Sequence, residues 1–282
     1  MNNQKAIVRE VLAEAEEKLK NYSETPRLDA EILLAKVLGK GRFELFTGDK
    51  DEIGEEKKAI FDSFILRRTN FEPVAYITNE KSFFEDTFFV DRRVLIPRPE
   101  SEFIVEEAVN LLKNTEKAEI LDICCGSGCI ALSIKRATGC RPTLSDISSG
   151  ALEVAKINAE RLFPGSSDIS FIQSDLFENI SGEFDLITAN PPYISDNDMK
   201  NFVVKEMEFE PENAFFGGET GFEITEKILD SVHKFLKQGG FFITELGYEG
   251  INFITDNYCG IKLQKTLKDY SGITRTAVFR KI

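Results

Sequence analysis

The 282-residue chain has no tryptophan, one histidine and no long hydrophobic run. An α-helix needs about 20 consecutive apolar residues to cross a bilayer, and no segment of this sequence approaches that length. Residues 1–20 are rich in Glu and Lys and have no apolar core, so they do not resemble a secretory signal. We therefore expect a cytoplasmic protein without a membrane association.

Cysteine and histidine are too few for a metal centre or a disulfide framework. An odd number of cysteines with one adjacent pair does not fit disulfide pairing. A zinc site needs about four ligands at a recognisable spacing, and His233 lies far from the cysteine-rich stretch. We expect no metal and reduced, mostly buried thiols. The five cysteines are Cys124, Cys125, Cys129, Cys140 and Cys259.

Basic residues are in the minority, with 35 Lys and Arg against 48 Asp and Glu and a net charge of −13. A protein that holds duplex DNA through its phosphates normally carries a basic stripe, so we expect no direct contact with nucleic acid. Most of the acidic excess falls after residue 75. It either attracts a basic protein partner or only keeps the protein soluble.

Helical periodicity occupies the first quarter of the chain. Apolar residues recur at helical spacing, Pro26 opens the second helical segment, and Gly39 is a plausible C-cap. We predict a small helical bundle over residues 1–75. Residues 76–100 then form a linker, in which we expect a β-hairpin with its turn at 85–87.

After residue 118 the pattern alternates between strands and helices. This alternation predicts an α/β fold with a Rossmann-like parallel sheet over residues 101–282 and helices on both faces. A helix is expected over 223–236, followed by a strand over 240–245. The last two expected strands, 261–268 and 274–280, predict an antiparallel end, which is typical of methyltransferase sheets rather than dehydrogenase sheets.

A glycine turn follows the first of these strands and opens a helix. Glycines let the backbone approach a ligand closely, and the helix N-terminus offers free N–H groups. Asp146 ends the next strand, where a carboxylate can accept both ribose hydroxyls of a nucleoside cofactor. This pair alone fits NAD about as well as S-adenosylmethionine, but the turn lacks the third glycine of the dinucleotide fingerprint, which favours S-adenosylmethionine. The turn consists of Cys124, Cys125, Gly126, Ser127 and Gly128.

Asp175 and Leu176 follow the third expected strand. In a doubly wound sheet this loop borders the adenine of the cofactor. Asp175 would accept from the adenine amino group and Leu176 would pack on the ring, although a solvated turn aspartate is an alternative that the sequence leaves open.

Asn190-Pro191-Pro192-Tyr193 follows the strand expected at 184–188. Two prolines remove two backbone donors, so the turn presents carbonyl acceptors. The Asn190 side-chain oxygen and the Pro191 carbonyl can each accept one N–H of a planar amino group, while Tyr193 packs on its π-plane. The motif therefore predicts methyl transfer to an amino nitrogen held for in-line attack. It serves amino groups of adenine, cytosine and glutamine alike, so it predicts the reaction and not the substrate.

Further motifs extend this pattern over nearly the whole chain. They are Pro26-Arg27-Leu28-Asp29-Ala30-Glu31, Arg67-Arg68, Glu72-Pro73-Val74-Ala75-Tyr76-Ile77, Leu95-Ile96-Pro97-Arg98-Pro99-Glu100, Phe209-Glu210-Pro211 and Asp269-Tyr270-Ser271-Gly272-Ile273-Thr274-Arg275. Together with the cofactor turn and the Asn-Pro-Pro-Tyr motif, they resemble the release factor glutamine methyltransferase family (PrmC/HemK). One departure is the Cys124-Cys125 pair, where the family usually has Gly or Cys and then Thr. We expect equal or weaker cofactor binding from it and no change of chemistry.

The resemblance implies a monomeric enzyme that methylates the glutamine of the Gly-Gly-Gln motif in class 1 peptide release factors. Its methyl donor would be S-adenosyl-L-methionine, with S-adenosyl-L-homocysteine as the product. It also implies that the helical region helps dock the release factor. Carried over to this sequence, the turn Cys124 to Gly128, Asp146, Leu176 and Asn190 would contact the cofactor, and Asn190 to Tyr193 would hold the glutamine.

Three alternatives remain at this point. The first is methylation of a glutamine in a large-subunit ribosomal protein, which uses the same motif. The second is methylation of DNA amino groups, which the acidic composition opposes. The third is a non-catalytic binding module, which the intact Asn-Pro-Pro-Tyr motif opposes.

Overall fold

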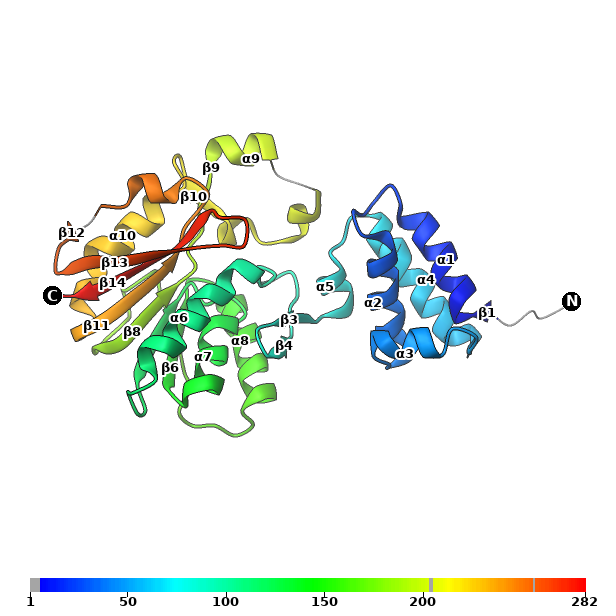
Figure 1. Cartoon of the computed structure of the whole chain (residues 1–282), viewed down its shortest axis with the longest axis horizontal. Helices are drawn as coiled ribbons and strands as arrows, with labels where there is room; N and C mark the ends of the chain where they lie inside the picture. The colour runs from blue at the N-terminus through cyan, green and yellow to red at the C-terminus, as the bar shows by residue number, and fades with distance from the viewer. Residues whose placement is uncertain (1–5, 203–204, 256) are drawn as a thin grey trace, which may run out of the picture. The chain divides into compact units, whose positions relative to one another are not determined.

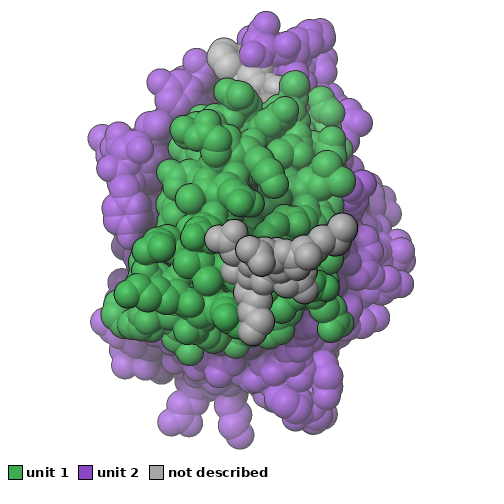
Figure 2. All heavy atoms as spheres, turned by 90° about the vertical axis from the view of Figure 1, so that its right-hand side faces the viewer, with its two compact units in different colours: residues 1–79, 205–209 green, residues 80–204, 210–282 purple. Residues whose placement is uncertain are grey.

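The computed structural model describes residues 6–202, 205–255 and 257–282. The chain divides into two compact units, which Figure 2 colours separately. The helical unit comprises Met1–Asn79 together with Lys205–Phe209, and the sheet unit comprises Glu80–Val204 and Glu210–Ile282. The domain limits expected at residues 75 and 100 stay predictions.

The helical unit is a small bundle of helices (Figure 1) around one apolar cluster. In α1, the buried residues Val8, Val11, Leu12, Ala15 and Leu19 follow the three- and four-residue spacing of one helix face. The expected helical bundle is confirmed. Its elements are β1 (Ala6–Ile7), α1 (Val8–Leu19), α2 (Pro26–Leu38), α3 (Arg42–Thr47), β2 (Glu52–Ile53), α4 (Glu55–Thr69), α5 (Val74–Thr78) and η2 (Lys205–Phe209).

Within the described residues, eight strands form one sheet in the order β12-β13-β14-β11-β8-β5-β6-β7. The strands from β11 to β7 run parallel, whereas β14 pairs antiparallel with both β11 and β13. The α/β fold with an antiparallel C-terminal end is therefore confirmed. The strands are β5 (Glu119–Ile123), β6 (Arg141–Asp146), β7 (Ser170–Gln173), β8 (Phe184–Ala189), β11 (Leu236–Glu245), β12 (Asn257–Tyr258), β13 (Ile261–Lys268) and β14 (Thr274–Lys281).

Helices cover both faces of this sheet, because successive strand residues point to opposite sides. Ile120 belongs to the apolar cluster that also contains residues of α6, α7 and α8, whereas its neighbour Leu121 belongs to the cluster that contains residues of α10. The helices are α6 (Glu102–Leu112), α7 (Cys129–Thr138), α8 (Ser149–Leu162) and α10 (Glu223–Ser231).

Short elements connect these larger ones. The β9 and β10 strands pair in parallel beside the Asn-Pro-Pro-Tyr motif, and the hairpin β3–β4 precedes α6. The remaining elements are β3 (Lys81–Phe83), β4 (Asp86–Phe88), η1 (Pro99–Ser101), β9 (Ile194–Ser195), α9 (Asp196–Phe202), η3 (Glu212–Ala214), β10 (Phe216–Gly218), η4 (Val232–Lys234) and η5 (Gly250–Phe253).

Two expectations about local structure were wrong in detail. The hairpin turn consists of Phe84 and Glu85, because Phe83 already pairs with Asp86, and Phe84 adopts a φ of 53°. The helix expected to reach residue 236 ends at Ser231, because Leu236 pairs with Phe184 and opens β11. Both differences come from pairing across strands, which local periodicity does not contain.

Among the described residues, none of the helices combines the length and apolar character that a membrane span requires. Nor do residues 6–202, 205–255 and 257–282 contain a group of three His, Cys, Asp or Glu side chains placed to hold a metal ion.

Candidate active site

A cavity of about 370 Å³ lies at the carboxyl ends of β5, β6 and β8, within the range of small-molecule sites. Most of the residues expected to bind the cofactor line it together. They are Cys124, Cys125, Gly126, Ser127, Asp146, Asp175, Leu176 and Asn190. Pro192 lines it as well, but Gly128, Pro191 and Tyr193 are not among the lining residues. The cavity therefore joins the glycine turn to the Asn-Pro-Pro-Tyr motif.

The glycine turn bends through three residues with positive φ angles: Cys124 at 56°, Gly126 at 52° and Gly128 at 78°. Gly128 has no room for a side chain, because an added Cβ would lie 2.8 Å from Cδ2 of Leu144. Gly126 has open space at the corresponding position. The two glycines thus serve different needs, since Gly128 permits close packing of the turn and Gly126 leaves its backbone open toward a ligand.

Asp146 fastens the turn to the end of β6. Its Oδ2 accepts from the Gly126 N–H at 2.9 Å and its Oδ1 accepts from the Ser148 N–H at 2.9 Å. Burial raises the pKa of Asp146, and the backbone N–H groups of Ser148, Gly126 and Ile147 oppose this rise. Each carboxylate oxygen keeps a further lone pair that can accept a ligand hydroxyl.

Asp122 lies fully buried in β5, directly before the turn, and the sequence analysis missed it. Its Oδ1 accepts from the Thr188 hydroxyl at 2.7 Å, and its Oδ2 has no partner within the described residues. Burial raises its pKa to about 7, against the hydrogen bond from Thr188. This carboxyl group therefore joins β5 to β8 directly before the turn.

The loop after β7 is tied to the same region. Leu176 has a φ of 45°, and the Ser174 N–H donates to the Asp146 carbonyl at 3.0 Å. These contacts hold Asp175 and Leu176 in the cavity wall. Their roles toward an adenine ring stay predictions.

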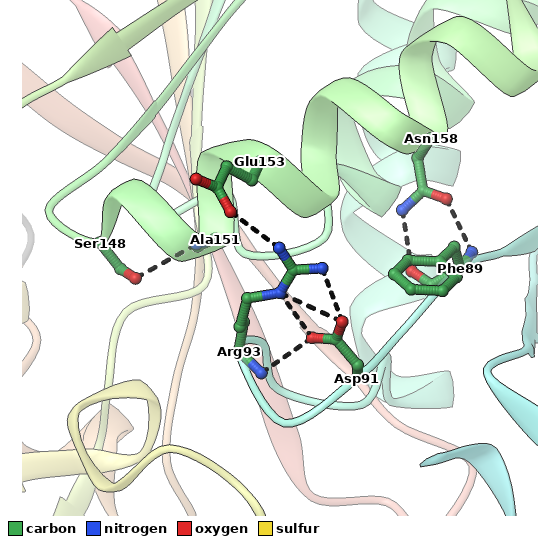
Figure 3. Close-up of polar contacts among 7 residues, drawn as sticks. All are labelled: Phe89, Asp91, Arg93, Ser148, Ala151, Glu153 and Asn158. Atoms are coloured by element: carbon green, nitrogen blue, oxygen red, sulfur yellow. Dashed lines mark hydrogen bonds and ion pairs between the residues drawn. The ribbon is translucent and has the colours of Figure 1, made fainter. Parts of the chain in front are cut away.

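The linker forms one rim of the cavity, where it contacts α8 (Figure 3). Asn158 pairs with both backbone groups of Phe89, at 2.7 and 3.0 Å, and also donates to the Ser127 carbonyl at 2.9 Å. Arg93, a lining residue, bonds to Asp91 and reaches Glu153 at 2.8 Å. Asn158 therefore connects the linker to the glycine turn.

The Asn-Pro-Pro-Tyr motif is held by a buried chain of hydrogen bonds. The Asn190 Nδ2 donates to Ser101 Oγ at 2.9 Å, and the Ser101 hydroxyl donates to Glu245 Oε2 at 2.5 Å. The Tyr193 hydroxyl donates to Glu245 Oε1 at 3.1 Å. Burial raises the pKa of Glu245 to about 7, against these hydrogen bonds and the positive charge of Arg275. Burial together with the Glu245 carboxylate also raises the pKa of Tyr193.

Three glycines pack against the backbone and ring of this motif. An added Cβ at Gly217 would lie 2.6 Å from the Pro192 carbonyl oxygen, and one at Gly221 would lie 2.3 Å from that of Tyr193. At Gly247 an added Cβ would approach the Tyr193 ring at 3.2 Å. The motif is therefore enclosed by backbone on several sides, which fixes its carbonyl groups.

Glu210 braces the linker beside the cavity. Its carboxylate accepts from the Ile96 N–H at 2.9 Å and from Arg98 Nη2 at 2.6 Å. Arg98 and Pro97 both line the cavity. The Phe-Glu-Pro motif thus positions the segment that follows the hairpin.

Sequence reasoning missed Ser101, Glu245 and Asp122. Glu245 ends β11 and therefore lies at the ligand-binding edge of a parallel sheet, which is a signal the sequence did contain. Ser101 had no comparable signal, because its partners are distant in sequence.

The cysteines of the turn are free thiols. Burial, followed by the nearby Asp146 and Asp122, raises the pKa of Cys124 and of Cys125, and burial raises that of Cys129, the first residue of α7, to about 12. The thiolate is the reactive form of cysteine, so these thiols are neutral and poorly nucleophilic.

Comparisons with known proteins cover both units. Residues 10–78 match the family described as the PrmC N-terminal domain, and residues 106–216 match the methyltransferase small domain. Proteins named release factor glutamine methyltransferase are similar over almost the whole length. The relative from Koribacter versatilis is 37% identical over 263 residues, covering 91% of this chain and 92% of the relative. Those from Leptospira interrogans and Rhodopirellula baltica are each 37% identical, covering 96% and 93% of this chain and 97% and 92% of the relative.

Proposed function

Because the chain belongs to the release factor glutamine methyltransferase family, we propose that it methylates the glutamine side-chain amide nitrogen, N5, in the Gly-Gly-Gln motif of class 1 peptide chain release factors. The chain is an S-adenosylmethionine-dependent methyltransferase. The single observation that supports the finer proposal is the joint position of the glycine turn and Asn190 in one cavity. A cofactor and a planar amide can meet there.

The residues present fit S-adenosylmethionine. Asp146 retains lone pairs for two ribose hydroxyls, while its bonds to Gly126 and Ser148 fix its orientation. Leu176 offers an apolar surface for the adenine, and Asp175 offers an acceptor for its amino group. When bound, the cofactor supplies an electrophilic methyl group on a sulfonium centre.

The motif orients the substrate amide. The Asn190 Oδ1 and the Pro191 carbonyl each accept one N–H of the glutamine side chain, so its nitrogen faces the methyl group. The Tyr193 ring is fixed by the bond from its hydroxyl to Glu245 at 3.1 Å and packs on the amide plane. Methylation of this nitrogen would release one of its two N–H protons to solvent. Because the nitrogen would become acidic only as it is methylated, no strong base would be needed early in the reaction.

The test is a transfer assay with labelled S-adenosylmethionine and purified release factor. A release factor with Gln→Ala in its Gly-Gly-Gln loop, a ribosomal protein substrate and unmethylated DNA are assayed in parallel. We expect label only on the intact release factor. Label on the ribosomal protein or on DNA would replace the proposed substrate, and no label on any of them would contradict the proposal.

A further inference from the structure

The hydrogen-bond chain behind the motif joins three distant segments of the sheet unit. Asn190 follows β8, Ser101 ends η1, and Glu245 ends β11. Ser101 and Glu245 are almost completely buried. Among the bonds described for the chain, neither residue bonds to a cation. The direction of each hydrogen bond therefore depends on which of Asn190, Ser101, Tyr193 and Glu245 carries a hydrogen to donate.

An ionised carboxylate can only accept hydrogen bonds. Glu245 faces two hydroxyls, Ser101 at 2.5 Å and Tyr193 at 3.1 Å, and each donates its one hydrogen to a different carboxylate oxygen. With its hydrogen committed to Glu245, Ser101 Oγ can only accept from Asn190. The Asn190 amide must therefore present its NH₂ to Ser101, at 2.9 Å.

We infer that Glu245 is a positioning residue that sets the orientation of the Asn190 amide, so that Oδ1 rather than Nδ2 is available to the substrate. This inference rests on the proposed function, in which Oδ1 accepts from the target amide. The opposite orientation would present an NH₂ group to another NH₂ group, and the substrate would lose a hydrogen bond. Glu245 acts through Ser101 and has no described bond to Asn190 itself.

A protonated Glu245 removes this constraint. A neutral carboxyl can donate to Ser101, whose own hydrogen is then free to point at Asn190 and favour the reversed amide. Glu245 faces the hydroxyls of Ser101 and Tyr193, the charges of Arg275 in β14 and Glu100 in η1, and the thiol of Cys129 at the start of α7. Arg275 and the two hydroxyls favour the ionised form, while burial and Glu100 oppose it. Activity should therefore rise with pH as Glu245 ionises.

The first test compares wild type, Glu245→Gln and Ser101→Ala, with Glu107→Gln as the matched control. Glu107 is also a buried glutamate of the sheet unit, but it pairs with Lys265. A glutamine at 245 can donate to Ser101, so we expect kcat to fall about 10–100-fold. Glu245 does not line the cavity, so the Kd of Glu245→Gln for S-adenosyl-L-homocysteine, measured by calorimetry, should change less than about 3-fold.

Two readouts separate positioning from a merely structural role. The ascending limb of the wild-type kcat–pH profile should disappear in Glu245→Gln and remain in Glu107→Gln. The double variant Glu245→Gln/Ser101→Ala should be no slower than the slower single variant, because both act through the same amide. Unchanged kcat in both single variants, or fully additive losses, would overturn the inference.

A measurement without substrate keeps this inference distinct from the proposed function. The Asn190 side-chain NH₂ signals are assigned in ¹⁵N–¹H NMR spectra by their loss in Asn190→Asp. We expect them to shift in Glu245→Gln and Ser101→Ala but not in Glu107→Gln, and to titrate in wild type with Glu245. Failure of release factor methylation with these shifts present would overturn only the substrate assignment. Asn190 NH₂ signals that do not shift in either Glu245→Gln or Ser101→Ala would overturn the role of Glu245.

Discussion

Buried carboxylates occur in both units, but the two units hold them differently. In the helical unit, Asp29 bonds to the Arg68 guanidinium at 2.7 Å, and Glu31 bonds to Arg27 and Arg42 at 2.7 and 2.8 Å. In the sheet unit, the side-chain hydrogen bonds described for Asp122 and Glu245 come from hydroxyl groups, at 2.7 Å for Asp122 and at 2.5 and 3.1 Å for Glu245. These two buried acids of the helical unit are therefore paired with cations, whereas no cation bonds to Asp122 or Glu245 among the contacts described for the chain.

This difference shows in the pKa values. Burial opposes ionisation of Glu31, but the hydrogen bonds and charges of Arg42 and Arg27 outweigh it and lower its pKa. Burial raises the pKa values of Asp122 and Glu245 to about 7. An ion pair thus fixes a charge for structural purposes, while a carboxyl held by hydroxyls can change its proton near neutral pH. Substitutions in the two units should therefore affect different properties.

The largest expected effect is on activity. Asn190→Ala removes the amide acceptor of the proposed site, and we expect kcat/KM to fall about 10³-fold, equivalent to about 4 kcal/mol of transition-state stabilisation. The melting temperature should change by no more than about 2 °C, because Asn190 is only half-buried and makes one described hydrogen bond. Methyl-transfer kinetics and thermal denaturation measure the two. Unchanged activity of Asn190→Ala would show that the Asn190 side chain is not needed for methyl transfer.

The next largest effect is on stability. Arg68→Ala leaves the buried carboxylate of Asp29 without its cation and also removes the bond to Glu206. We expect the free energy of unfolding of the helical unit to fall by about 3 kcal/mol. Urea unfolding followed by helical circular dichroism measures this loss. The exposed Arg9 is the matched control, and Arg9→Ala should cost less than about 0.5 kcal/mol. Equal costs for both variants would show that the buried ion pair contributes nothing.

A pair of glycines tests the comparison at the level of the backbone. Gly128 and Gly39 both have positive φ angles, 78° and 67°, but an added Cβ collides with Leu144 only at Gly128. We expect Gly128→Ala to destabilise by about 2 kcal/mol, since backbone strain and crowding add, and to weaken cofactor binding. Gly39→Ala should cost about 1 kcal/mol from backbone strain alone, with cofactor affinity unchanged. Calorimetric titration with S-adenosyl-L-homocysteine measures the affinity of both variants. Equal affinities would contradict the role of Gly128 in cofactor binding.

The smallest expected effect is on the pH dependence of stability. Asp122 has a folded-state pKa of about 7, above its unfolded value, so the folded state retains a proton that the unfolded chain releases. Its contribution therefore falls as the pH rises from about 4 to about 7. Glu31 has a lowered pKa, so its contribution is lost only as the pH falls below its ordinary range.

Asp122→Asn should therefore flatten the stability of the sheet unit between about pH 6 and about pH 7, by about 1 kcal/mol. Urea unfolding at the two pH values measures the change. Glu31→Gln is the control from the helical unit and should leave this interval unaffected. An unchanged slope in Asp122→Asn would show that its carboxyl is already ionised in the folded protein.

The sequence predicted the parts of the fold that depend on local periodicity and on turn residues. The helical bundle and the alternating sheet followed from apolar spacing, whereas the strand order came from the structure. The features that the sequence did not predict depend on pairing between strands. Leu236, for example, belongs to β11 because it pairs with Phe184 of β8.

The site shows the same division. The glycine turn and the Asn-Pro-Pro-Tyr motif are each formed by consecutive residues, so both could be predicted from the sequence. The contacts of Ser101 with Glu245, 144 positions apart, could not. These contacts depend on the finished fold, because no local pattern connects the end of η1 to the end of β11.

Because residues 205–209 belong to the helical unit, this unit cannot be completed early in biosynthesis. The unit is discontinuous, because the 125 residues of Glu80–Val204 separate its two parts. A ribosome adds about 5–20 residues per second, so Asp29 and Arg68 emerge many seconds before Glu206, the second ion-pair partner of Arg68. The bundle must therefore persist for that time with an incomplete set of contacts. A gene fusion at a single point could not transfer this unit intact, because part of it is encoded within the other unit.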